Sequence, residues 1–189
     1  ERLEEISEQQ TESLAALQGE DMPDILPGQT EMEEQEPDRQ EEEHGESVSY
    51  FARWTDRYKE AREYLYGTME AEPDEEAAHE IMLEEAEQGN AYAMHDMGKI
   101  YAQGIGCEAD KEKADVWYQK ALAAMHYVEQ KKKNTYLEYR IGKMYQYGLG
   151  TDENLEQAAE WFSKAAAKEH KYALYSLGML YLQGKGVEQ

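Results

Sequence analysis

The pattern G-x-x-Y-x-x-G-x-G occurs three times in the second half of the chain and restricts the fold more than any other feature. Its first glycines are Gly98, Gly142 and Gly178, so the pattern recurs after 44 and then after 36 residues. Repeats of this length are typical of stacked pairs of helices. We therefore predict an array of helical repeats.

Each first glycine lies inside the pattern of an amphipathic helix. Residues four apart share one helix face, and apolar trios with this spacing surround the glycines: Ala93, Met97, Tyr101; Leu137, Ile141, Tyr145; Ala173, Leu177, Tyr181. A glycine there costs about 1 kcal/mol relative to alanine. Burial of one large apolar side chain contributes about 1.5–3 kcal/mol. We expect that a second helix approaches these glycines closely and offsets their cost with buried aromatic side chains.

The later glycines of each pattern, Gly104 and Gly106 in the first copy, suit a left-handed helix end followed by a tight turn. A second amphipathic helix follows the turn in the first two copies. Its face consists of alanines and aromatic residues at i, i+3, i+4 and i+7: Ala114, Trp117, Tyr118, Ala121; Ala158, Trp161, Phe162, Ala165. The first unit has eight extra residues within 125–134, and we expect them to lengthen the connection to the next pair.

The segment before the repeats predicts a capping pair, which helical arrays need at their ends. Residues 75–90 align with a second helix, with Ala78 at the position of Ala158. Residues 49–67 read as a single helix. Its apolar side consists of Phe51, Trp54, Tyr58, Ala61 and Leu65.

Residues 1–47 differ from the rest of the chain in charge. They contain 17 acidic residues and only two basic ones, a net charge of −15 within a total of −23. Few apolar residues and strong self-repulsion oppose folding. We predict a disordered acidic tail or linker, in which residues 3–17 could form a short helix.

The pattern A-x-x-x-L/M/I-G-x-x-Y-x-x-G-x-G, followed by K-A-x-x-W-Y-x-K-A, resembles the Sel1-like repeat family, which is related to tetratricopeptide repeats. The resemblance covers roughly residues 74–189. Cys107 and Thr151 depart from it, because they occupy the position where Val187 shows the usual valine. The third unit lacks its second helix, so we expect an unburied face on the last helix.

This resemblance implies an all-α fold, a right-handed α-solenoid of antiparallel helix pairs preceded by the disordered acidic segment. The expected divisions are 1–47 (tail), 48–90 (degenerate cap), 91–134 (repeat 1), 135–170 (repeat 2) and 171–189 (truncated repeat 3).

Family resemblance also implies binding of a protein or peptide on the concave surface lined by the first helices. A helical wheel at about 100° per residue gives the arc opposite the core: Tyr92, Asp96, Lys99, Gln103; Tyr136, Arg140, Lys143, Tyr147; Tyr172, Ser176, Met179, Gln183. Tyrosine and arginine are enriched in binding hot spots. We expect Lys99, Arg140 and Lys143 to be exposed. For the tyrosines, binding and packing between units both remain open, and His95, Tyr139 and Tyr175 lie at the edge of the arc.

Catalytic and metal-binding patterns are missing from the sequence. The five histidines have no zinc-ligand spacing, and Cys107 suits a small apolar position better than a reactive thiol. The run Lys131–Lys133 is too short, in a strongly acidic chain, to predict nucleic-acid binding. No apolar run approaches the about 20 residues of a membrane span. We expect no cofactor, no metal, no enzyme activity and no membrane contact, and a cytoplasmic monomer.

An acidic tail, the segment 48–67 and then Sel1-like units also resembles the C-terminal half of mobilisation relaxases from Gram-positive conjugative elements. Both ends of the chain read as cut from something longer. Two functions therefore stay open: an adaptor for a protein partner, and the accessory arm of a DNA-nicking relaxase whose catalytic domain lies upstream.

Overall fold

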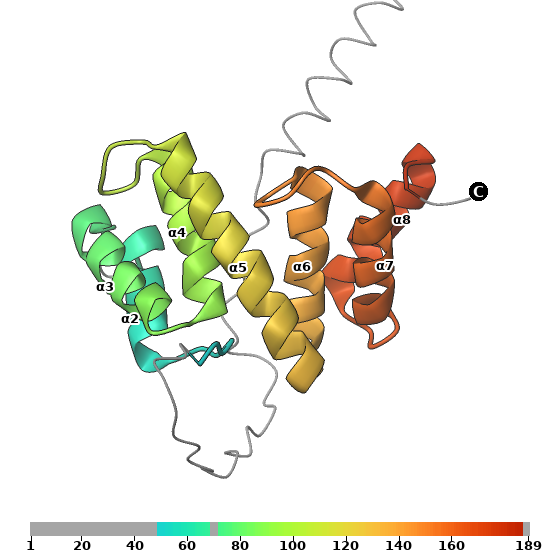
Figure 1. The fold of residues 1–189 in the computed structure, drawn as a ribbon, viewed down its shortest axis with the longest axis horizontal. Helices are drawn as coiled ribbons and strands as arrows, with labels where there is room; N and C mark the ends of the chain where they lie inside the picture. Colours follow the sequence, from blue (N-terminus) through green and yellow to red (C-terminus); the bar gives the residue numbers. More distant parts are fainter. Residues whose placement is uncertain (1–48, 69–71, 187–189) are drawn as a thin grey trace, which may run out of the picture. The chain divides into compact units, whose positions relative to one another are not determined.

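Short polar side chains set where the helices of this protein begin. The computed structural model describes residues 49–68 and 72–186. Within these ranges lie seven helices and no strand, apart from an isolated bridge between Phe51 and Asn90 (Figure 1). The helices are α2 (Asp56–Tyr66), α3 (Glu75–Glu87), α4 (Ala91–Gln103), α5 (Lys111–Lys131), α6 (Thr135–Tyr147), α7 (Leu155–Ala166) and α8 (Lys171–Gln183).

Each of these helices has an N-cap side chain that accepts a hydrogen bond from a backbone amide of the first turn. The caps are Thr55, Asp74, Asn90, Asp110, Asn134, Asn154 and His170. Gly104, Gly148 and Gly184 end α4, α6 and α8 with φ of 71°, 64° and 63°. The predicted left-handed helix ends are thus confirmed.

The helices form the predicted all-α solenoid of antiparallel pairs. α2 pairs with α3, α4 with α5 and α6 with α7, while α8 packs against α7 (Figure 1). α2, α4, α6 and α8 are the first helices of their pairs. No helix among the described residues is long and apolar enough to cross a membrane.

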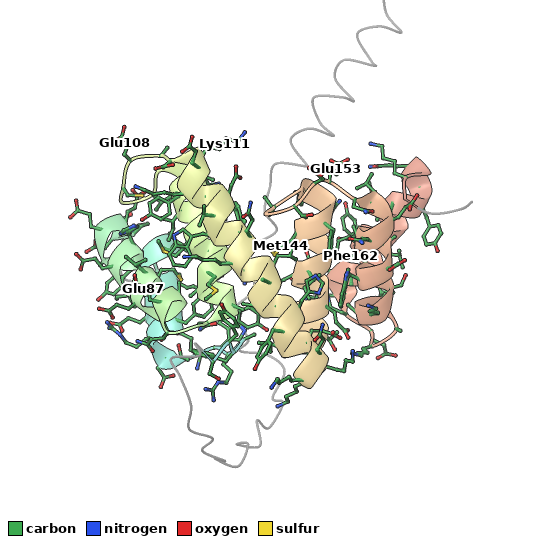
Figure 2. All side chains as sticks on the ribbon, viewed as in Figure 1. Glu87, Glu108, Lys111, Met144, Glu153 and Phe162 are labelled. Carbon is green, nitrogen blue, oxygen red and sulfur yellow. The ribbon has the colours of Figure 1, made fainter. Side chains whose placement is uncertain are left out.

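Close helix approach explains the interior glycines. A Cβ added at Gly98 would lie 2.5 Å from Cδ1 of Tyr118, and one at Gly142 would lie 2.6 Å from Cδ1 of Phe162. Figure 2 labels Phe162, which points from α7 toward α6. The aromatic rings therefore occupy the space that the glycines leave, as the sequence predicts.

Two expectations about helix bounds are wrong. Residues 49–67 are not one helix, because α2 begins only after its cap Thr55, whose backbone is extended, and Phe51 forms a bridge with Asn90. The extra residues after repeat 1 do not lengthen a loop. They extend α5 to 21 residues, against 12 in α7, and within this extension Met125 and Glu129 are buried.

α8 has the unburied face that the sequence predicts for the last helix. Ala173, Ser176 and Leu180 are buried on one side, whereas Leu174, Tyr175, Tyr181 and Leu182 are 51%, 58%, 49% and 77% exposed. The tail predicted for residues 1–47, with its short helix at 3–17, lies outside the described residues.

Candidate functional site

The first helices place two rows of equivalent residues side by side. One row is aromatic and consists of Tyr58, Tyr92, Tyr136 and Tyr172, and the other is polar and consists of Arg62, Asp96, Arg140 and Ser176. Members of a row are separated by one repeat, so each helix contributes one residue to each row. We call these rows, together with the side chains one and two turns further along the same faces of α2, α4, α6 and α8, the first-helix face.

A buried ion cluster joins three helices at the centre of this face. Arg62 Nη1 on α2 lies 3.2 Å from Asp96 Oδ2, and Arg140 Nη2 on α6 lies 2.7 Å from Asp96 Oδ1. The Tyr58 hydroxyl donates to Asp96 Oδ2 at 2.7 Å. The three charged side chains are between 2% and 4% exposed. Their positions are therefore fixed by one another across α2, α4 and α6.

The electrostatics of the cluster follow from these contacts. Burial by itself raises the pKa of Asp96, but Arg140, His95 and Arg62 together outweigh burial and hold that pKa well below its usual range. Asp96 is thus an anion between two cations. Burial, reinforced by the charge of Asp96, raises the pKa of Tyr58, so its hydroxyl keeps its proton.

His95 lies beside the cluster. Its Nδ1 is 2.6 Å from Arg140 Nη2 and 3.0 Å from Asp96 Oδ1. One nitrogen cannot accept from the guanidinium and donate to the carboxylate at once, so Nδ1 makes one contact when it lacks a proton and the other when it carries one. Within its own unit His95 also contacts Tyr118 of α5 edge to face, with 5.5 Å between ring centroids.

Aromatic rings surround the two arginines. The Tyr92 and Tyr136 rings meet edge to face with centroids 5.4 Å apart, and the Arg140 guanidinium lies 5.4 Å and 5.7 Å from their centroids. Arg62 lies 5.3 Å from the ring of Trp54 and 4.9 Å from that of Tyr66. Cation–π contacts of this kind strengthen when they are desolvated.

The outer part of the face is basic, aromatic and accessible. Lys143 Nζ lies 4.4 Å from the Tyr147 ring centroid and donates to its hydroxyl at 3.1 Å. Lys99 Nζ lies 5.5 Å from the ring of Tyr66. Tyr66 and Tyr147 are 49% and 45% exposed, and both lysines are half-buried.

The structure corrects the expected exposure of Arg140. Arg140 is 3% exposed, because the neighbouring first helices bring Asp96 and Tyr92 against it. Lys99 and Lys143 are half-buried and so only partly agree with the expectation.

The remaining candidates divide by depth. Tyr92, Asp96 and Ser176 are 1%, 1% and 8% exposed, so they belong to the packed layer beneath the face. Packing between units is thereby the role of Tyr92. Tyr136, Tyr172 and Met179 are half-buried, and Tyr147 is exposed.

Sequence reasoning missed Arg62 and Tyr58 as members of the face. Both lie in α2, which was assigned to a cap and not aligned with the first helices. The signal was present: each lies 34 residues before its equivalent in α4, Asp96 and Tyr92 respectively. This spacing is close to the 36 residues that separate Gly142 from Gly178.

The other singled-out residues do not form a reactive site. Cys107 packs against the core, and burial raises the pKa of its thiol. Within residues 49–68 and 72–186, no group of three or more histidine, cysteine or acidic side chains is arranged to hold a metal ion.

Comparison with known families identifies the repeats. The Sel1 repeat family matches residues 58–90, 91–124, 136–170 and 171–189. These segments together make up more than half of the chain, so this protein belongs to the Sel1 repeat family. Sel1 repeats are typically non-catalytic scaffolds for protein–protein interaction. The comparisons do not support the resemblance to relaxases.

Two solved structures are similar to this chain. A Sel1 repeat protein from Oxalobacter formigenes is 29% identical with a TM-score of 0.47, and the match covers 70% of this chain and 51% of that one. The protective antigen c5321 of uropathogenic Escherichia coli, which displays an SLR fold, is 27% identical with a TM-score of 0.48, with 70% and 27% covered. This chain therefore spans about half and about a quarter of their lengths. Comparison with curated proteins gave no match.

Proposed function

We propose that this protein is a non-catalytic scaffold that binds a protein or peptide partner on the first-helix face. The observation that carries this proposal is the lysine–tyrosine pair of α6, in which the half-buried Lys143 lies over the exposed ring of Tyr147. A cation held over an exposed aromatic ring offers a charge and an apolar surface to one partner. Tyrosine is among the residue types that dominate binding energy in interfaces.

The buried cluster supports the proposal because it preorganises the face. Asp96 ties Arg62 of α2 to Arg140 of α6, so three of the first helices are held in place before a partner arrives. Binding to a surface that is already ordered loses less conformational entropy.

The charge of the face indicates an acidic partner segment. The chain as a whole carries −23, yet the rows and their outer turn contain four basic residues, Arg62, Lys99, Arg140 and Lys143, and one acidic residue, Asp96. Such a local reversal of sign steers an oppositely charged partner to this surface.

The experiment is affinity capture by the full chain from cells that make it. The test variant is Lys99→Glu with Lys143→Glu, which leaves the buried cluster intact. The matched control is Lys111→Glu with Lys132→Glu, which makes the same change of charge at exposed positions on and beside α5. Figure 2 labels Lys111.

We expect a protein that the parent and the control retain and the test variant loses by tenfold or more, with retention that falls as salt is raised. Equal loss from both variants would mean that only net charge matters. Equal retention by both would mean that the partner binds another surface. Either outcome contradicts the proposed face.

A further inference from the structure

Two equivalent lysines of the first-helix face each lie over a tyrosine ring. Lys99 and Lys143 come directly after the interior glycines of α4 and α6, so they occupy the same position in successive repeats. Lys143 Nζ lies 4.4 Å from the ring centroid of Tyr147, and Lys99 Nζ lies 5.5 Å from that of Tyr66 on α2. We call these two sites the lysine–tyrosine subsites.

Each subsite offers a cation and an aromatic surface to the same stretch of a partner chain. An ammonium group has three N–H donors, so a carboxylate of the partner can add to the contacts that the lysine already makes. Tyr66 and Tyr147 are 49% and 45% exposed, so residues next to that carboxylate can pack against the ring. Each subsite therefore suits an acidic residue with an apolar neighbour in the partner.

The distance between the subsites follows from the spacing of α4 and α6. These helices are neighbours, since Arg140 Nη2 lies 2.7 Å from Asp96 Oδ1 and the Tyr92 and Tyr136 rings meet with centroids 5.4 Å apart. Packed helices lie about 8–10 Å apart between axes, and large side chains at the contact favour the upper end of this range. A partner that crosses both helices must present two acidic residues about 10 Å apart.

The polyproline II conformation meets this requirement and a β-strand does not. Polyproline II has three residues per turn and a rise of about 3.1 Å, so residues three apart share one side of the chain and lie about 9 Å apart. In a strand, residues two and four apart share one side, at about 7 and about 13 Å. Aromatic side chains recognise polyproline II segments, whose conformation is already formed before binding. Repulsion between acidic residues also keeps a chain extended.

Resting on the proposed function, we propose that the partner segment is an acidic chain in the polyproline II conformation with two Asp or Glu residues three positions apart. It crosses α4 and α6 and places one carboxylate at Lys99 and the other at Lys143. The two residues between the acids, for which proline is well suited, pack against the tyrosine rings. The recognised pattern is acid-x-x-acid.

Peptides that differ only in the spacing of two glutamates test this proposal. Each consists of the same number of prolines, which fix the polyproline II conformation, and of two glutamates placed two, three or four positions apart. Fluorescence anisotropy of the labelled peptides, titrated with the full chain, measures their affinities. We expect the peptide with a spacing of three to bind threefold or more tighter than the other two, which have the same composition and net charge.

Substitutions in the protein locate the peptide. Lys99→Gln and Lys143→Gln should each lower the affinity of the spacing-three peptide threefold or more, whereas Lys111→Gln, at an exposed position of α5, should not change it. Replacement of one glutamate of the peptide by glutamine should have no further effect in the variant that lacks the lysine facing it. This double-mutant cycle also assigns the direction of the peptide across α4 and α6.

Three results would overturn the proposal. They are equal affinity, or no binding, at all three spacings; a preference for a spacing of three that both lysine variants leave unchanged; and tighter binding of a helical alanine-based peptide with glutamates seven positions apart, which also span about 10.5 Å. The capture experiment separates these results from failure of the proposed function. A partner lost from the Lys99→Glu, Lys143→Glu variant would keep the first-helix face as the binding surface, although its segment would then have another conformation.

Discussion

Adding one methyl group at Gly142 should destabilise the protein, and adding the same group at Gly178 should stabilise it. Both glycines occupy the same position in a first helix, so the gain in helix propensity from Gly→Ala, about 1 kcal/mol, is common to both. The neighbours differ. The new Cβ at Gly142 would lie 2.6 Å from two carbons of Phe162, and the one at Gly178 would have open space around it.

The magnitude follows from the burial of Phe162. An ordinary contact of a Cβ lies at 3.4–4 Å, so the ring and α6 must separate by about an ångström, and Phe162 is 0% exposed with no room to turn away. Overpacking of this kind costs about 1–3 kcal/mol. The two variants should therefore differ by that amount in their free energy of unfolding.

Urea denaturation at low micromolar concentration measures this difference. With a slope of about 2 kcal/mol/M, the midpoints should differ by about 0.5–1.5 M. Equal stabilisation by Gly142→Ala and Gly178→Ala would refute the packing account of the interior glycines. Phe162→Leu provides a check, because it should cost less in the Gly142→Ala background than in the parent.

Three further predictions concern charge and pH. Asp96→Asn leaves two arginines in a buried site without their anion and should cost about 3–5 kcal/mol at pH 7. Because the folded pKa of Asp96 lies below its unfolded value of about 3.9, its contribution is present above that pH and lost below it, so the urea midpoints of parent and variant should converge toward pH 3. Burial lowers the pKa of His126, which contacts the Tyr145 hydroxyl at 3.0 Å. Its stabilisation should be complete above about pH 6.5 and decline below, and His126→Gln should flatten the change in melting temperature between pH 7 and pH 5; an unchanged slope would contradict this. Arg140→Glu should greatly reduce the melting temperature whereas Lys143→Glu should change stability by about 0.5 kcal/mol or less, and similar effects would place Arg140 back on the surface.

The fold was predictable because its glycines have local causes. Gly104 and Gly148 adopt a positive φ, and Gly98 and Gly142 leave room for an aromatic ring of the second helix. Each requirement fixes a glycine at one position of the repeat, so the same glycine can be recognised in successive repeats. The start of α2 was harder to see. Trp54 continues the apolar spacing of that helix in the sequence, but the helix itself begins only after its cap, Thr55.

The candidate site was only partly predictable, because a helical wheel treats each helix alone. It correctly places Asp96 and Arg140 away from the core of their own pairs. It cannot show that neighbouring first helices lie close enough for Asp96 to contact both Arg140 and Arg62, which lies 34 residues before it. These side chains are buried by contacts between repeats, which the sequence of a single repeat does not indicate.

The contact between α2 and α6 also bears on how the protein unfolds. Repeat arrays usually lose stability unit by unit, since each unit touches only its neighbours. Here the ring of Trp54, next to α2, lies 5.9 Å from that of Tyr136 on α6, and Arg140 lies 3.4 Å from the Tyr58 hydroxyl, so these contacts pass over a whole repeat. The amide protons of α2, α4 and α6 should exchange with solvent in one cooperative opening, while those of α8 should exchange earlier and independently.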